Sequence, residues 1–230
     1  MKNVAPVVCT VLVLLLSQFV SVHPQIPVGE TVQSQERTVK CAEDSPERRG
    51  EEGCTILVTR PLLASRIKPL YWHIDRFDSL AAAKKAAGPD GFAVEAHGYV
   101  WLMTVEVLTK KEHHGGHHVA RIGPLPIPAV DQLTMRVQSS LLKPGTTTLV
   151  HTHSGPEVFY VVTGRQCVET LKFGKPLVSG RSFIVPAGVV HRGRVIGSEI
   201  RGALALVLHD SALPASNNLI DNPPPVTPCK

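Results

Sequence analysis

The residues best suited to chemistry lie in the segment PGTTTLVHTHSGPEVFYVVTG, residues 144–164. His151 and His153 stand two residues apart, so on a β-strand both imidazoles point to the same face. Glu157 follows a Ser-Gly-Pro turn that lets the next strand return alongside the first. A third histidine, His191, ends the later run GRSFIVPAGVVH. Three neutral imidazoles and one carboxylate predict a site for one divalent transition metal ion (Fe, Mn, Ni, Cu or Zn), with one or two positions left for water or substrate.

The same residues resemble the two sequence motifs of the cupin superfamily. The first motif, G(x)5HxH(x)3-4E(x)6G, is matched at Gly145, His151, His153, Glu157 and Gly164. The second, G(x)5PxG(x)2H(x)3N, is matched at Gly180, Pro186, Gly188 and His191, and it fails at Val195, which stands in place of Asn. The resemblance implies that all four metal ligands of the family are present. The departure at Val195 would change the surroundings of the ligands rather than the ligands themselves.

The resemblance also implies a fold. One copy of the motif pair is similar to single-barrel, bacterial-type cupin-domain proteins, whose ligands point into the cavity of a double-stranded β-helix, or jelly-roll barrel. The similarity is best over residues 131–210 and weaker over the strands that precede them from residue 99. We therefore predict an all-β protein with a cupin barrel over 99–210 and a small N-terminal α+β extension over 55–98.

The local patterns agree with an all-β fold. Runs of alternating apolar residues, separated by Gly and Pro at regular spacing, follow one another from residue 99 to 210 and predict a barrel or sandwich. Before them, residues 55–59 and 71–77 are typical of strands. The run LAAAKKAA predicts one short helix, with Asp78 or Ser79 able to cap its N-terminus and Gly88 suited to its C-terminal end. After Asp210 the prolines and the lack of periodicity predict a flexible tail over 211–230.

The N-terminus has the layout of a secretory signal. A lysine at position 2 is followed by an uncharged apolar stretch over 4–16 and then by more polar residues, so 1–23 is predicted to be a signal peptide. An uncleaved anchor over 4–22 is the alternative, and it is the only reading that involves a membrane. Either way we expect an exported protein, periplasmic or secreted. Residues 24–54 are polar and predict a loosely ordered arm.

The cysteines fit an oxidising compartment. Four of them, Cys41, Cys54, Cys167 and Cys229, lie outside the signal. Cys41 and Cys54 bracket a short polar stretch, and we predict a disulfide between them within the arm. Cys167 and Cys229 could pair with each other or remain as a buried and an exposed thiol.

The other histidines carry weaker signals. The run HHGGHH, with His113, His114, His117 and His118, is typical of a solvated hairpin tip, and a second metal site is the less favoured alternative. His73 and His97 stand alone and predict surface or core positions. His209, beside Asp210, is expected to cap the end of the last strand.

Composition narrows the class of function. The 230 residues, 43% hydrophobic and 19% charged, describe one globular domain with appendages. The net charge of +5 is scattered and aromatic residues make up only 5%, so we expect no nucleic-acid partner. A barrel with edge strands makes a homodimer plausible.

The predicted function is metal-dependent cleavage of a small phenolic or other organic substrate by dioxygen. A redox-active ion with open positions permits this chemistry, and Glu157 could remain a ligand or act catalytically by accepting a proton from an acidic hydroxyl. Phe159 and Val161, on one face of a strand, are expected to line the substrate pocket. Two alternatives use the same ligands: a non-catalytic, metal-stabilised module that binds a small ligand, and a Lewis-acid isomerase or lyase.

Overall fold

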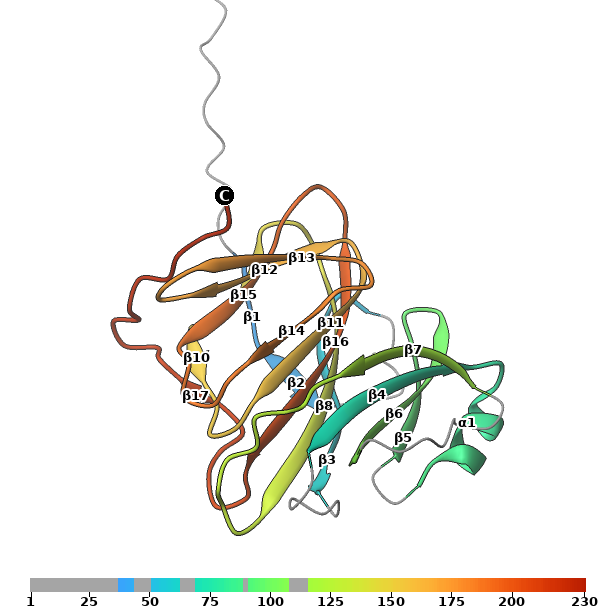
Figure 1. The fold of residues 1–230 in the computed structure, drawn as a ribbon. Helices are drawn as coiled ribbons and strands as arrows, with labels where there is room; N and C mark the ends of the chain where they lie inside the picture. Colours follow the sequence, from blue (N-terminus) through green and yellow to red (C-terminus); the bar gives the residue numbers. More distant parts are fainter. Residues whose placement is uncertain (1–36, 44–50, 63–68, 89–90, 108–115) are drawn as a thin grey trace, which may run out of the picture. The chain divides into compact units, whose positions relative to one another are not determined.

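The computed structural model describes residues 37–43, 51–62, 69–88, 91–107 and 116–230 (Figure 1). The predicted signal peptide or anchor therefore lies outside the described residues, as do His113 and His114. No helix in the described part of the chain has the length and apolar character that a membrane crossing needs.

Two sheets form the barrel (Figure 1). The first holds β1 (Arg37–Val39), β9 (Thr146–Thr148), β15 (His191–Val195), β10 (His151–Thr152), β17 (Asn217–Asn218), β12 (Arg165–Thr170) and β13 (Gly174–Val178). The second holds, in spatial order, β14 (Ser182–Val185), β11 (Glu157–Thr163), β16 (Arg201–Asp210), β8 (Leu133–Leu142), β3 (Gly53–Pro61) and β2 (Cys41–Glu43). An apolar cluster with members from both sheets, including Val161, Val168 and Val185, fills part of the space between them. The predicted all-β jelly-roll class is confirmed.

A third sheet holds strands that the sequence analysis divided differently. It contains, in spatial order, β5 (Gly91–Ala96), β6 (Tyr99–Val107), β4 (Leu70–Phe77) and β7 (His117–Ile122). The strand over Tyr99–Val107, expected in the barrel, thus pairs with β4 and β5 instead. Conversely β3, expected in the N-terminal extension, joins the barrel sheet through β8.

Packing explains this arrangement. Trp72 of β4 and Trp101 of β6 are almost completely buried, and they belong to the same apolar cluster as Met135 of β8 and Leu206 of β16. The barrel sheet is therefore covered on its outer face as well as its inner one. A strand buried on both faces needs no polar residues, which accounts for the continuous apolar run of β16.

The predicted helix is present as α1 (Leu80–Ala86). The side chain of Ser79 accepts a hydrogen bond from the backbone N–H of Ala82 and caps the first turn (3.2 Å). Ala83 packs against Phe77 and Leu102 and gives the helix its buried face. The last helical residue precedes Gly88 by two positions, because Ala87 is already extended.

His97 joins the third sheet to the barrel. It lies in the turn between β5 and β6 with φ of 54°, and its Nε2 is 3.0 Å from Ser139 Oγ and 3.3 Å from the carbonyl oxygen of Ala203. Both partners belong to the barrel sheet. Burial lowers the pKa of His97 below its ordinary value, and the bond to the Ala203 carbonyl opposes this shift only in part.

This lowered pKa predicts a loss of stability in mild acid. The unfolded chain takes up a proton on His97 near pH 6.5, while the folded chain resists it, so the free energy of unfolding falls as pH drops below 6.5. The variant His97→Asn keeps a polar side chain that tolerates positive φ and cannot titrate. In urea unfolding at pH 7.5 and 5.5 we expect wild type to lose more stability than the variant. Equal losses in the two proteins would contradict this role.

Candidate metal site

Four buried side chains converge on one point inside the barrel. His151 belongs to β10, His153 follows it, Glu157 begins β11 and His191 begins β15. One ligand atom from each of the four lies within 4.8 Å of all the others. Glu157 Oε2 is 2.7 Å from His191 Nε2, 3.3 Å from His153 Nε2 and 3.7 Å from His151 Nε2. The structure thus brings together all four residues predicted as ligands.

The local backbone produces this convergence. His151 is directly opposite His191 in the pairing of β10 with β15, which places both imidazoles on one face of the sheet. The turn between β10 and β11 then carries the chain to the second sheet. Gly155 is required in this turn, because a Cβ there would collide with the carbonyl oxygen of Leu208. At the other side, the N–H of Gly188 donates to the carbonyl oxygen of His153 (2.9 Å) and fixes the loop before His191.

Backbone carbonyls set the tautomer of each imidazole. The Nδ1 atoms donate to three carbonyl oxygens: His151 to Leu149 (2.7 Å), His153 to Ala215 (2.5 Å) and His191 to Val189 (2.9 Å). With each Nδ1 proton donated to a carbonyl, Nε2 is the atom that faces Glu157, where it can bind a metal ion through its lone pair or carry a proton that it donates to the carboxylate. Three Nε2 atoms and a carboxylate oxygen therefore point at one another, an arrangement that a cation at their centre stabilises. Outer hydrogen bonds of this kind are typical of histidines that bind metals.

The electrostatics of the cluster favour an ionised carboxylate. Burial alone would raise the pKa of Glu157, but the charge of His153 and hydrogen bonds from the three imidazoles hold it well below its ordinary range. For His153, burial lowers the pKa, and the charge and hydrogen bond of Glu157 outweigh it, so the net shift is upward. Burial dominates at His191 and lowers its pKa. The cluster thus presents an anionic oxygen to any cation it holds, which fits the divalent transition metal ions predicted from the residue types.

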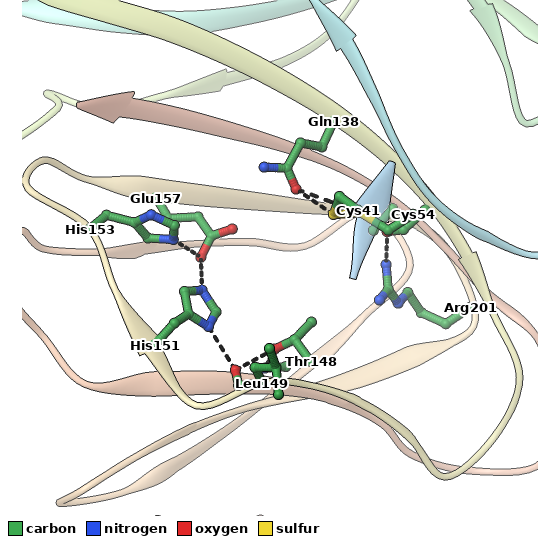
Figure 2. The surroundings of a disulfide bond; sticks show 12 residues. Cys41, Cys54, Gln138, Thr148, Leu149, His151, His153, Glu157 and Arg201 are labelled. Carbon is green, nitrogen blue, oxygen red and sulfur yellow. Dashed lines mark hydrogen bonds and ion pairs between the residues drawn. A yellow bond between two sulfur atoms is a disulfide. The ribbon is translucent and has the colours of Figure 1, made fainter. Parts of the chain in front are cut away.

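The cluster opens into a cavity of about 490 Å³. The wall includes Phe159. It also includes the disulfide between Cys41 and Cys54 and the side chains of Gln138 and Arg201, which are labelled in Figure 2. Phe159 therefore occupies the wall position expected of it. Val161 was expected to line the pocket too, but it is not among the described residues of the cavity wall. It lies fully buried in the apolar cluster between the two sheets.

The C-terminal segment, predicted to be a flexible tail, completes the site. Its strand β17 pairs with β10, with Asn218 opposite His151, and the Leu219 N–H donates to the Val150 carbonyl oxygen (2.8 Å). The cavity wall includes Pro214, Ala215, Ser216 and Asn218. The expectation of a loose tail is wrong, because these residues are held by backbone hydrogen bonds, which leave no periodic apolar signal in the sequence.

Both disulfides lie near the cavity or its closing segment. The predicted bond between Cys41 and Cys54 is confirmed, and it joins β2 to the neighbouring β3 rather than clipping a loose arm. The bond between Cys167 and Cys229, left open by the sequence, ties the C-terminal segment to β12 across 62 residues. Two disulfides are typical of proteins that fold in an oxidising compartment.

The remaining histidines lie apart from this cluster. His118 Nδ1 is 2.9 Å from Asp75 Oδ1, and the rings of His118 and His73 are 5.9 Å apart. His117 begins β7, so the described half of HHGGHH belongs to a strand. His209 is buried and its Nδ1 donates to the carbonyl oxygen of Asp210 (2.9 Å), as expected of a capping residue. Among the described residues, the cluster in the barrel is the one group of three or more His, Cys, Asp or Glu side chains whose ligand atoms lie close enough together to hold a metal ion.

Comparisons with known proteins found one family model and several solved structures that are similar to part of the chain. Residues 139–208, which contain all four ligands, match the family model described as a cupin domain. A cupin-2 domain-containing protein from Shewanella frigidimarina is similar in structure, with 19% identity, a TM-score of 0.28, and coverage of 31% of this chain and 68% of that one. For a cupin-like protein from Thermotoga maritima the identity is 20%, the TM-score 0.33, and the coverage 38% and 64%.

A variant of oxalate decarboxylase from Bacillus subtilis is also similar, with 22% identity and a TM-score of 0.34. This match covers 38% of the present chain and only 24% of the enzyme. A search of curated proteins found no match.

Proposed function

Because residues 139–208 match a cupin-domain model and hold four converging ligand atoms, we propose that this protein is an exported, metal-dependent dioxygenase that acts on a small phenolic or other organic substrate. The observation that carries the proposal is the fixed tautomer of three imidazoles. Each Nδ1 is committed to a backbone carbonyl, and each Nε2 faces Glu157 at the inner end of a cavity. This arrangement is preorganised for an ion and accessible to a ligand.

The residues around the site have distinct roles in this proposal. A redox-active ion such as Fe, Mn, Ni or Cu would supply adjacent positions for substrate and dioxygen, both atoms of which enter the product, so that no external reductant is consumed. Glu157, held ionised, is placed to accept the proton of an acidic hydroxyl group. Phe159 offers the ring of a phenolic substrate an aromatic surface on the cavity wall. Val161 packs in the same apolar cluster and supports the position of Phe159.

Burial and charge around the site support an acidic substrate. The cavity wall carries three cationic side chains, Lys40, Arg136 and Arg201, and one carboxylate, Glu157. A phenol loses its proton more readily in such surroundings, because the phenolate is stabilised by the cations. The two disulfides support the exported location.

The test is dioxygen uptake by protein reconstituted separately with Fe, Mn, Ni and Cu, with catechol and a flavonol as substrates. We expect uptake with at least one ion and no uptake by His151→Ala. The variant His117→Ala, which removes an exposed imidazole of β7, is the matched control and should retain full activity. Absence of uptake with all four ions would overturn the dioxygenase. Turnover without dioxygen would favour a Lewis-acid isomerase or lyase, and tight ligand binding without turnover would favour a binding module.

A further inference from the structure

The cavity contains a buried cation with an unused donor. Arg201, the first residue of β16, is only 5% exposed. Its Nη1 donates to Ser140 Oγ (2.5 Å), while its Nε is buried and has no hydrogen-bond partner among the described residues. In Figure 2 the guanidinium lies beside Cys54, across the cavity from His151 and Glu157. Leaving such a donor unpaired is costly in a folded protein, so this one is a candidate for binding a ligand.

A second unused donor lines the same cavity. Gln166 of β12 is 1% exposed, and its Nε2 also has no partner within the described part of the chain. Gln166 and Arg201 lie at the same end of the barrel. Gly164, two residues before Gln166, packs so closely on Arg201 that a Cβ at Gly164 would lie 3.0 Å from the Arg201 Cα. Both residues therefore line the cavity, one of them is charged, and each has a buried donor with no acceptor in the described part of the chain.

This end of the cavity is well separated from the metal ligands. Gln166 is paired with Val195, which lies four residues beyond His191 on β15. Four residues of strand span about 13 Å. A ligand that reaches from the histidines to the two donors must therefore be elongated, and the cavity volume of about 490 Å³ accommodates a molecule of that kind.

The charge of the cavity fixes the chemistry of that ligand. Burial lowers the pKa of Arg201 to about 10 although the charge of Glu157 acts in the opposite direction, and the guanidinium therefore stays cationic at neutral pH. The carboxylate in the wall, Glu157, lies with the three imidazoles at the opposite end. An anion at the Arg201 end would neutralise the charge and give the two side chains the acceptor that they lack. A planar carboxylate matches the fork of a guanidinium best.

We infer that the cavity binds an elongated organic acid, with its carboxylate on Arg201 and Gln166 and its other end directed at the His151, His153, Glu157 and His191 cluster. The assignment of the far end as metal-binding rests on the proposed function. The assignment of the carboxylate subsite does not rest on the proposed function, because it depends only on residues outside the metal cluster. The substrate class is thereby narrowed from phenols in general to phenols or hydroxy acids that carry a carboxylate at the opposite end of the molecule from the hydroxyl group.

The test compares acids with their amides on one protein. Caffeate and its primary amide share a catechol end and differ only in the charge at the other end, and 3,4-dihydroxybenzoate with its amide is the shorter pair. Binding is measured by calorimetry on Zn²⁺-loaded protein, which excludes turnover, and again on metal-free protein. In wild type we expect caffeate to bind about 10- to 100-fold more tightly than its amide. The shorter pair, which cannot span the cavity, should show a smaller preference.

Variants assign the preference to the subsite. In Arg201→Gln the acid and the amide should bind within about threefold of each other, and in Gln166→Leu the preference should fall in part. The exposed Arg181, replaced in Arg181→Gln, is the matched control and should leave the preference intact. Equal binding of acid and amide by wild type overturns the inference even if Arg201→Gln fails to fold. A preference that survives in Arg201→Gln overturns it too, because the anion would then lie on Arg136 or Lys40.

The two proposals fail separately. Dioxygen uptake without an acid preference would leave the dioxygenase and remove the carboxylate subsite. An acid preference in metal-free and Zn²⁺-loaded protein without dioxygen uptake would keep the subsite and remove the dioxygenase.

Discussion

Protein purified without an affinity tag is expected to carry close to one equivalent of a divalent transition metal ion, and His191→Ala is expected to carry almost none. The imidazole of His191 is fully buried, and its Nε2 is 2.7 Å from Glu157 Oε2, closer than either of the other two imidazoles. Loss of a partner that only orients a ligand weakens metal binding about 10- to 100-fold, so loss of a ligand itself should weaken it by more. Elemental mass spectrometry of dialysed protein measures the content.

A control must separate the barrel site from the surface histidines. In His117→Ala the metal content should equal that of wild type, because His117 lies at the exposed start of β7. A conservative variant, Glu157→Gln, keeps the size of the side chain but removes the anionic oxygen, and it should also lose most of the metal. If His191→Ala retains a full equivalent while His117→Ala loses it, the metal site is in the third sheet and the cluster in the barrel is structural.

The metal cluster could be predicted because its geometry is local. The two-residue spacing of His151 and His153 fixes a shared face through the pleat of the strand, and the short turn before Glu157 brings the carboxylate back to them. His191 was harder, since it is 34 residues from Glu157, and only the resemblance to a known motif placed it there. The carbonyls that orient the imidazoles were beyond prediction, because every residue has a carbonyl and the sequence does not mark which ones accept.

The partition of strands between barrel and third sheet could not be predicted. The runs that became β3 and β6 both look like half-buried strands, and nothing within either run specifies its neighbour. The choice depends on long-range packing, in which Trp72 and Trp101 cover the outer face of β16. A double-sided apolar strand was visible in the run GALALVL, and it indicates that a further layer must exist.

The carboxylate subsite could not be predicted from the sequence, for a related reason. Arg201 and Gln166 are common residue types at unremarkable positions, and they acquire meaning only when burial removes water from their donors. The even number of cysteines did carry a usable signal for the C-terminal segment. Pairing of Cys167 with Cys229 implies that the last residues lie against β12, which contradicts a free tail.

Removal of that disulfide by the double variant Cys167→Ser, Cys229→Ser is expected to lower the free energy of unfolding by about 4 kcal/mol, from the chain entropy of a 62-residue loop. Urea unfolding with a common slope measures the difference. Metal binding should weaken as well, about 10- to 100-fold, because the Ala215 carbonyl that orients His153 belongs to the segment that the disulfide holds in place. A chelator competition at fixed pH measures that second effect.

The other disulfide provides the matched control. Cys41→Ser, Cys54→Ser opens a loop of only 13 residues and should cost about 3 kcal/mol, although it leaves the contact between Ala215 and His153 intact. The two variants should therefore be similar in stability and differ in metal affinity. If both bind metal as tightly as wild type, the pairing of β17 with β10 holds the segment unaided, and the disulfide to Cys229 serves stability alone. If both lose metal equally, the loss follows from general destabilisation, and Ala215 has no separate part in orienting His153.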